Sequence, residues 1–391
     1  MSRRPGTREG PLTLITGGAG FIGTNLAKRL LSQGAPVLLF DDLSRAGVER
    51  NLAWLRARYP ERLQVEIADV RDMPAVRRAV DRADRIFHLA AQVAVTTSLL
   101  DPLRDFEINA RGTLNVLEAA RARPQPPPLL LTSTNKVYGA LPDVQLERQG
   151  RRYTPVDARL AASGLDEHRA LDFHSPYGCS KGAADQYVLD YARCFGLPAV
   201  VFRMSCIYGP HQCGTEDQGW VAHFLMRARD HQTLTIYGDG CQVRDVLYVE
   251  DLVDALLLAM RRIERLAGQA FNIGGGPANS VSLLELLSLM AERLRLEARV
   301  EHAGWRSGDQ RYYVTNSRKF AAATGWSPAI SVTEGLSRLD EWTRSESGEA
   351  VPLAAPGGSA PGPGVLSGRS PPEPSRPPEP ARAPGRISGS A

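Results

Sequence analysis

Tyr177 and Lys181 stand four residues apart in a segment that we expect to open a helix, so both side chains should lie on one helix face. Ser175 suits the capping position of that helix, and Pro176 suits its first turn. A free tyrosine has a pKa of about 10, too high for a base near neutral pH. A neighbouring ammonium group stabilises the phenolate, so we expect Lys181 to lower the pKa of Tyr177. Such a pair can take a proton from a hydroxyl group.

A second chemical group follows the apolar run Leu129–Leu131, where Ser133 and Thr134 end a predicted strand. Ligands of parallel sheets bind at the carboxyl ends of the strands. We therefore expect the Thr134 hydroxyl to reach the same substrate oxygen as Tyr177. A tyrosine and a lysine at this spacing also occur as an ordinary pair on helix surfaces. The Thr134 hydroxyl at the predicted strand end is what makes a catalytic interpretation of Tyr177 and Lys181 specific.

A glycine cluster near the start of the chain lies between two predicted elements of the fold that positions this chemistry. Gly17, Gly20 and Gly23 lie between a strand predicted near 12–16 and a helix predicted over 21–31. Glycines in this context allow a tight turn, and the helix N-terminus, with Phe21 and Ile22 in its first turn, attracts a pyrophosphate. The segment therefore predicts a dinucleotide site.

Asp41 ends the second predicted strand and indicates which dinucleotide binds. A carboxylate there accepts hydrogen bonds from an adenosine ribose and repels a 2′-phosphate, which favours NAD over NADP. Arg45 keeps NADP as an alternative cofactor, because an arginine near the ribose can accommodate the 2′-phosphate. Asp69 ends the third strand and either meets the adenine or caps a turn. Further expected cofactor contacts are Asp42, Ser44, Val70, Ala90, Asn109, Ser133, Tyr177 and Lys181.

Alternating strands and helices continue through the first two hundred residues, which predicts an α/β fold with a doubly wound parallel Rossmann sheet. We expect an NAD-binding domain over 11–204 and a smaller substrate-binding domain over 205–345, with strands around 244–274 returning to the main sheet. Residues 350–391 are rich in Pro, Gly and Ser and are expected to form a disordered tail.

Composition narrows the class of protein. The 391 residues are 43% hydrophobic, enough for one large or two modest cores. Five cysteines without a Cys-x-x-Cys pair read as reduced thiols, and no metal site is expected. No signal peptide or membrane span is evident, so we expect a soluble cytoplasmic protein. The formal charge of +4 lies in the terminal segments 1–10 and 350–391. The rest of the chain has no net charge, so we expect no basic surface for nucleic acid.

Taken together, these motifs resemble the extended short-chain dehydrogenase/reductases over roughly residues 12–345. Five longer segments are similar to the CDP-paratose 2-epimerases, also called CDP-tyvelose epimerases. These segments are 40–45, 133–139, 172–186, 217–221 and 242–246.

The resemblance implies an isomerase that uses tightly held NAD to epimerise carbon 2 of a CDP-hexose, through a keto intermediate and return of the hydride. Tyr177 would take the hydroxyl proton, Thr134 would hold the oxygen, and Lys181 would tune Tyr177 and bind the nicotinamide ribose. Arg244 would meet the diphosphate, and Arg306 and Asp309 would approach the phosphate and nucleoside ribose. Further implied substrate contacts are Gln92, His174, Cys206, Gln218 and Trp220. The resemblance also implies a homo-oligomer.

Several alternatives stay open. A 4,6-dehydratase on the same scaffold needs an acid and a base after the catalytic threonine, whereas Asn135 and Lys136 stand there. Lys136 is expected either to contact the substrate or to lie at the surface. A carbon-4 epimerase, or an epimerase acting on CDP-glucose, uses the same catalytic residues. A non-catalytic NAD-binding protein is disfavoured, because such proteins usually lose the tyrosine or the lysine.

Overall fold

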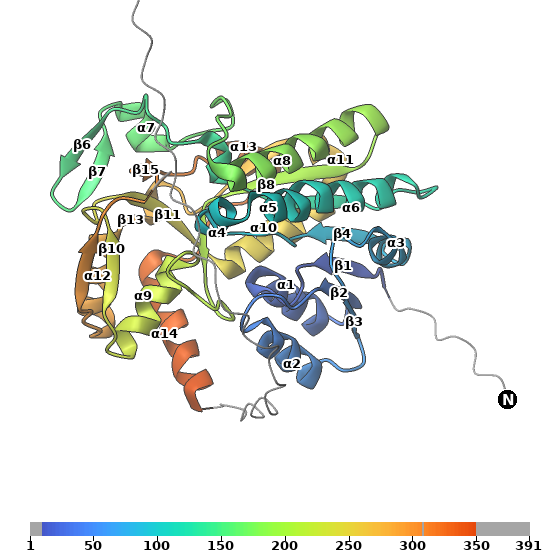
Figure 1. Cartoon of the computed structure of the whole chain (residues 1–391), viewed down its shortest axis with the longest axis horizontal. Helices are drawn as coiled ribbons and strands as arrows, with labels where there is room; N and C mark the ends of the chain where they lie inside the picture. Colours follow the sequence, from blue (N-terminus) through green and yellow to red (C-terminus); the bar gives the residue numbers. More distant parts are fainter. Residues whose placement is uncertain (1–9, 307–308, 349–391) are drawn as a thin grey trace, which may run out of the picture. The chain divides into compact units, whose positions relative to one another are not determined.

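Seven parallel strands form the central sheet of the protein (Figure 1). The computed structural model describes residues 10–306 and 309–348. The strand order is β12-β8-β5-β4-β1-β2-β3. The chain reverses its direction of travel across the sheet beside β1, as in a doubly wound sheet, and this confirms the predicted fold class. The strands are β1 (Thr13–Thr16), β2 (Val37–Asp41), β3 (Leu63–Ile67), β4 (Arg85–His88), β5 (Leu129–Thr134), β8 (Ala199–Met204) and β12 (Ala270–Ile273).

Helices cover both faces of this sheet, because strands buried on both sides present apolar side chains in both directions. Apolar residues of α1, α2 and α10 pack on one face, and those of α3, α6 and α8 pack on the other. These helices are α1 (Phe21–Ser32), α2 (Val48–Arg58), α3 (Met73–Asp81), α6 (Gly112–Arg121), α8 (Ser175–Phe195) and α10 (Val249–Arg261).

Two helical segments are interrupted by π turns. The first, over 102–121, is divided into α5 (Pro102–Phe106), the π turn η1 (Glu107–Arg111) and α6. A side chain on Gly112 would lie 2.7 Å from Val70, so glycine allows this helix to pack closely on the segment after β3. The second, over 283–294, consists of α12 (Leu283–Leu289) and the π turn η4 (Met290–Leu294). Such turns are frequent at functional sites.

A second region lies beside the carboxyl edge of the sheet. Its strand β11 (Val243–Tyr248) pairs with β9 (Cys206–Tyr208), β13 (Ser280–Ser282) and β15 (Tyr312–Tyr313). Strand β10 (Leu234–Tyr237) pairs with β14 (Val300–Ala303). Helices α9 (Trp220–Arg229), α12 and α14 (Val332–Gly348) pack around these strands. Of the strands predicted to rejoin the main sheet, β12 is its edge strand, whereas β11 belongs to the second sheet.

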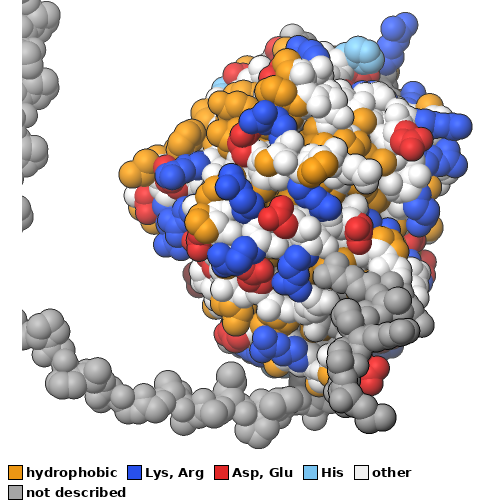
Figure 2. Space-filling model, turned by 90° about the vertical axis from the view of Figure 1, so that its right-hand side faces the viewer, with side chains coloured by type: hydrophobic (Ala, Val, Ile, Leu, Met, Phe, Trp, Pro, Cys, Tyr) orange, Lys and Arg blue, Asp and Glu red, His pale blue; other side chains and the backbone are white. Residues whose placement is uncertain are grey.

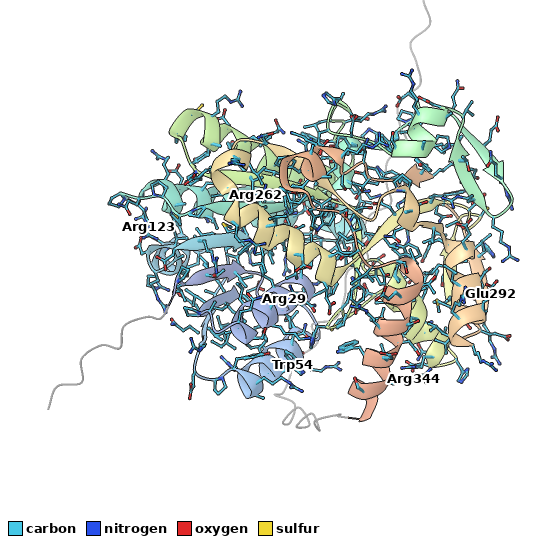
Figure 3. All side chains as sticks on the ribbon, turned by 180° about the vertical axis from the view of Figure 1, so that it is seen from behind. Arg29, Trp54, Arg123, Arg262, Glu292 and Arg344 are labelled. Atoms are coloured by element: carbon cyan, nitrogen blue, oxygen red, sulfur yellow. The ribbon has the colours of Figure 1, made fainter. Side chains whose placement is uncertain are left out.

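The two regions are joined by aromatic packing around His211. His211 contacts Trp54 of α2 and Trp342 of α14, with ring centres 4.5 and 5.4 Å apart. Seen from behind, Trp54 of α2 and Arg344 of α14 both lie in the lower part of the view (Figure 3). The segment after β9 is thereby held between helices from both halves of the chain.

The remaining elements connect these layers. They are α4 (Val95–Leu100), the short turn η2 (Asn135–Tyr138), the hairpin β6 (Leu146–Gln149) and β7 (Arg152–Pro155), α7 (Ala158–Ser163), α11 (Ile263–Leu266), η3 (Pro277–Asn279) and α13 (Arg318–Thr324). Within 10–306 and 309–348, no helix combines the length and apolar character needed to span a bilayer. The disordered tail predicted over 350–391 lies outside the described residues.

Candidate active site

A cleft of about 840 Å³ opens at the carboxyl ends of β1, β2, β4 and β5. It lies where the strand order reverses, which is the usual ligand site of a doubly wound sheet. Its opposite wall comes from the second region, with residues of segments 204–224 and 235–244 and with Leu283, Arg306 and Asp309. The cleft therefore has a wall built from the main sheet and a wall built from the rest of the chain.

The glycine turn forms one end of the cleft. Gly17 has a φ of +67°, and a Cβ atom there would lie 2.7 Å from the amide nitrogen of Ala90. The turn thus needs glycine both for its backbone conformation and for its close contact with the end of β4. Gly20 precedes α1 and provides no capping side chain. The N–H groups of the first turn, including Phe21 and Ile22, are available to a phosphate.

Asp41 fastens the end of β2 to this turn. Its carboxylate accepts hydrogen bonds from the N–H groups of Ala19 at 3.0 Å and Leu43 at 2.9 Å. Burial raises the pKa of Asp41 more than these bonds lower it. Asp69 also lines the cleft, but it forms an ion pair with Arg71 at 2.6 Å, and the hydrogen bond from Arg71 lowers its pKa.

Nearly all of the residues predicted to bind cofactor or substrate line this cleft. They are Gly17, Gly20, Phe21, Ile22, Gly23, Asp41, Asp42, Ser44, Arg45, Asp69, Val70, Ala90, Gln92, Ser133, Thr134, Tyr177, Lys181, Cys206, Gln218, Trp220, Arg244, Arg306 and Asp309.

Asn109 and His174 are not among the lining residues. Asn109 lies buried on the π turn η1, where it accepts a hydrogen bond from the Gln92 N–H at 2.9 Å and donates to Ser180 Oγ at 3.0 Å. It therefore fixes the wall segment after β4 to helix α8. His174 directly precedes α8, with its side chain 45% exposed and 3.0 Å from Asp172. Ligand contacts by these two residues stay predictions.

The two catalytic candidates meet at the centre of the cleft. A side-chain hydrogen bond joins Thr134 and Tyr177, and both residues are buried. Thr134 ends β5, and its Oγ1 accepts a hydrogen bond from the Lys136 N–H at 3.2 Å. The N–H of Tyr177 donates to Ser98 Oγ at 3.2 Å, which fixes the first turn of α8. The two hydroxyl groups therefore lie next to each other, and their shared contact with one substrate oxygen stays a prediction.

The expected effect of Lys181 on Tyr177 is not observed in the protein alone. Burial raises the pKa of Tyr177 to about 12, while the hydrogen bond with Thr134 and the charge of Arg45 act to lower it. Lys181 Nζ instead donates to the carbonyl oxygen of Thr132 at 2.7 Å. Burial also lowers the pKa of Lys181 to about 8, because it disfavours the charged ammonium. Helix spacing brought the residues together but carried no information on their desolvation.

Several buried polar atoms of the cleft suit a polar ligand such as NAD. Ser133 Oγ, Gln92 Oε1 and Gln242 Oε1 have no hydrogen-bond partner in the described part of the protein, and all three residues line the cleft. Buried polar atoms are rarely left without a partner. Together with the open helix N-terminus and the carboxylate of Asp41 at the end of β2, these groups fit a dinucleotide. Among the described residues no cluster of His, Cys, Asp or Glu could hold a metal ion.

Charged side chains form the opposite wall. Arg244 Nη2 lies 2.7 Å from Asp309 Oδ1, and Lys136 Nζ lies 4.0 Å from the same oxygen. Arg306 lies over the ring of Tyr237 and pairs with Asp217 at 3.2 Å. Cys206, Gln218 and Trp220 also line this part of the cleft.

Lys136, for which the sequence left substrate contact and a surface position open, lines the cleft. Some other lining residues were not among the predicted site residues. Gln242 could have been found from its place two residues before Arg244. The wall segment 93–97 carries no recognisable motif, so its contribution was not predictable.

Comparison with known proteins agrees with this architecture. The model of the NAD dependent epimerase/dehydratase family matches residues 13–274. A CDP-paratose 2-epimerase of Salmonella typhi is 46% identical over 339 residues, which cover 85% of this chain and 99% of that protein.

Solved structures of enzymes of this kind are similar to this chain over most of its length. The UDP-glucose 4-epimerase of Thermus thermophilus, in complex with NAD, superimposes with a TM-score of 0.72 at 32% identity, over 85% of this chain and 99% of that one. A dTDP-glucose 4,6-dehydratase from Streptomyces venezuelae with NAD bound has a TM-score of 0.74 at 28% identity, over 86% and 98% of the two chains. The chain belongs to the NAD-dependent epimerase/dehydratase family.

Proposed function

We propose that this protein is an isomerase that uses NAD to epimerise a CDP-hexose at carbon 2, in a reaction of the CDP-paratose to CDP-tyvelose type. The observation that carries this proposal is the 46% identity to the Salmonella CDP-paratose 2-epimerase along nearly its whole length. The cleft supports it, because a hydrogen-bonded threonine and tyrosine lie beside a dinucleotide cradle. A role in assembling cell-surface polysaccharide such as O-antigen fits that substrate.

The side chains have separate tasks in this reaction. Tyr177 takes the proton from the carbon-2 hydroxyl group, and Thr134 holds the same oxygen through a hydrogen bond. Lys181, a buried residue of the cleft lining, orients the nicotinamide ribose next to the reacting carbon and keeps a positive charge near the phenol. Bound NAD supplies a hydride acceptor and donor, and its positive ring favours the phenolate that burial alone disfavours. The proton then returns from Tyr177 to the same oxygen.

The opposite wall holds the rest of the substrate. We propose that Arg244 binds the diphosphate, that Arg306 and Asp309 approach the phosphate and ribose, and that Gln218 and Trp220 contact the base or sugar. In this proposal residues 11–204 bind the cofactor and residues 205–345 supply most substrate contacts. Arginine suits the diphosphate because its planar fork matches phosphate oxygens.

Incubation with CDP-paratose and with CDP-glucose in deuterium oxide, without added reductant, tests the proposal. We expect epimerisation at carbon 2 of at least one substrate, followed by NMR, with no solvent deuterium at that carbon. Deuterium uptake at carbon 2 would show deprotonation and reprotonation instead of hydride return. Failure to convert either substrate would overturn the proposed activity.

A carbon-4 epimerase is the second candidate, favoured by the likeness to UDP-glucose 4-epimerases of known structure. UDP-glucose and CDP-glucose offered under the same conditions separate the two functions, because product inverted at carbon 4 identifies this alternative. Dehydration is less favoured, since Asn135 and Lys136 stand where a dehydratase needs an acid and a base.

We also propose that the enzyme works in the cytoplasm as a homo-oligomer. Exposed apolar side chains gather on α4, α5 and α8, which contact one another. They include Leu100, 86% exposed, Leu103, 70% exposed, and Tyr187, 45% exposed. Hydrophobic side chains also gather in the upper left of the face seen in Figure 2. Exposed apolar side chains on neighbouring helices favour contact with a second copy, and sedimentation analysis would test it.

A further inference from the structure

Lys136 lies directly beside the catalytic pair. It follows β5 by two residues, and its N–H group donates to Thr134 Oγ1, so its backbone is fixed to the catalytic hydroxyl. Its side chain lines the cleft and is 22% exposed. Its fixed backbone and low exposure distinguish Lys136 from an ordinary surface lysine.

Charge is unevenly distributed along this wall. At the inner end, Lys136 and Arg244 both approach the carboxylate of Asp309, and the side chain of Arg244 is 9% exposed. At the outer end, Arg306 faces both Glu216 and Asp217, whose side chains are 44% and 42% exposed. Positive charge therefore predominates at the inner end, beside Thr134. Burial and the charge of Arg244 lower the pKa of Lys136 to about 8, so a bound anion would stabilise its ammonium.

The proposed substrate places an anion at that point. Carbon 2 of a nucleotide sugar is bonded to the anomeric carbon, which carries the diphosphate. When the carbon-2 oxygen meets Thr134 and Tyr177, the phosphoryl group nearest the sugar must lie close to the same hydroxyl groups. When the carbon-4 oxygen meets them, that phosphoryl group lies across the sugar ring. A cation next to the catalytic threonine suits the first orientation.

We propose that Lys136, together with Arg244, binds the phosphoryl group that is attached to the sugar and thereby selects carbon 2 for reaction. This inference rests on the proposed function, since it assigns the orientation of the substrate in the same cleft. It gives Lys136 a role in binding and specificity, distinct from the proton transfer of Tyr177.

Binding of CDP and CMP to the NAD-loaded protein tests the assignment without any turnover. CDP carries the phosphoryl group in question, and CMP lacks it. In Lys136→Met we expect the preference for CDP over CMP to fall by about tenfold or more, because one charge-assisted contact is lost. The affinity for CMP should stay unchanged. Calorimetric titration measures both constants, and NAD content and thermal unfolding show whether the variant is folded.

Two further variants sharpen the result. Lys136→Arg keeps the positive charge and should retain most of the preference for CDP. This variant also tests the proposal when Lys136→Met does not fold. Lys28→Met removes an exposed lysine of α1 outside the cleft and should leave both affinities unchanged. An unchanged preference for CDP in Lys136→Met, or equal weakening of CDP and CMP, would overturn the proposal. Because nucleotide binding needs no epimerisation, these outcomes are separable from failure of the proposed activity.

Discussion

The two walls of the cleft are built in different ways. The cofactor wall consists of turns at strand ends, where Gly17, Asp41 and Thr134 are held by backbone contacts within the main sheet. The substrate wall consists of charged side chains from distant segments, where Arg244 and Asp309 hold each other. A wall fixed by backbone should be rigid and specific for one cofactor, whereas paired side chains can exchange partners with a charged substrate. Substitutions in the two walls should therefore have separable effects.

Loss of the Tyr177 hydroxyl group should have the largest effect on turnover, because cofactor and substrate, held by the two walls, react next to this group. In Tyr177→Phe we expect kcat to fall by about a thousandfold, since the proton acceptor is removed. Bound NAD, measured after denaturation, should stay near the level of the unchanged protein. Tyr187→Phe, on an exposed position of the same helix, serves as the control. Turnover close to normal in Tyr177→Phe would contradict the assignment.

Arg244→Met should affect the substrate wall alone. We expect the KM for the CDP-hexose to rise by about a hundredfold, because a charge-assisted contact is lost and Asp309 keeps its negative charge. NAD content should not change. Arg338→Met, in which an arginine 41% exposed on α14 is replaced, is the matched control. Loss of NAD from Arg244→Met would show that the two walls are not separable.

Gly17→Ala should affect the cofactor wall. The new methyl group would lie 2.7 Å from the Ala90 amide nitrogen, so we expect bound NAD to fall by about tenfold. Gly150 has a similar φ, +61°, but nothing lies within 4 Å of a Cβ there. Gly150→Ala thus carries the same backbone strain without the contact and should retain its NAD. Equal NAD content in the two variants would argue against close packing at the turn.

The smallest expected effect is a dependence of CDP binding on pH. The pKa of Lys136 is about 8, so its ammonium is charged below that pH and loses its charge as the pH rises. CDP affinity should fall a few-fold between about pH 7 and pH 9.5, while CMP affinity stays constant. Arg244, Asp309 and Cys206 face Lys136, and burial raises the pKa of the Cys206 thiol.

Lys136→Arg provides the control for this titration, because arginine keeps its charge throughout the range. The fall in CDP affinity should disappear in this variant. A fall that persists there would assign the titration to a group other than Lys136.

The contrast between the walls also explains what sequence reasoning could predict. The glycine turn, the strand ends and the Tyr177 helix have local signals, so fold and cofactor cradle were predictable from short segments. The ion pair of Arg244 with Asp309 depends on tertiary packing and has no such signal. The raised pKa of Tyr177 depends on burial, which spacing on a helix does not report. The close approach of Gly112 to Val70, next to the π turn that carries Asn109, likewise depends on tertiary packing.

A crystal structure of the enzyme with NAD and a CDP-hexose bound tests most directly which sugar oxygen Thr134 and Tyr177 hold. We expect Tyr177 Oη and Thr134 Oγ1 both to lie within hydrogen-bond distance of the carbon-2 oxygen, with that carbon facing the nicotinamide. A structure in which the carbon-4 oxygen occupies this place, or in which Tyr177 is turned away from the dinucleotide, would contradict it.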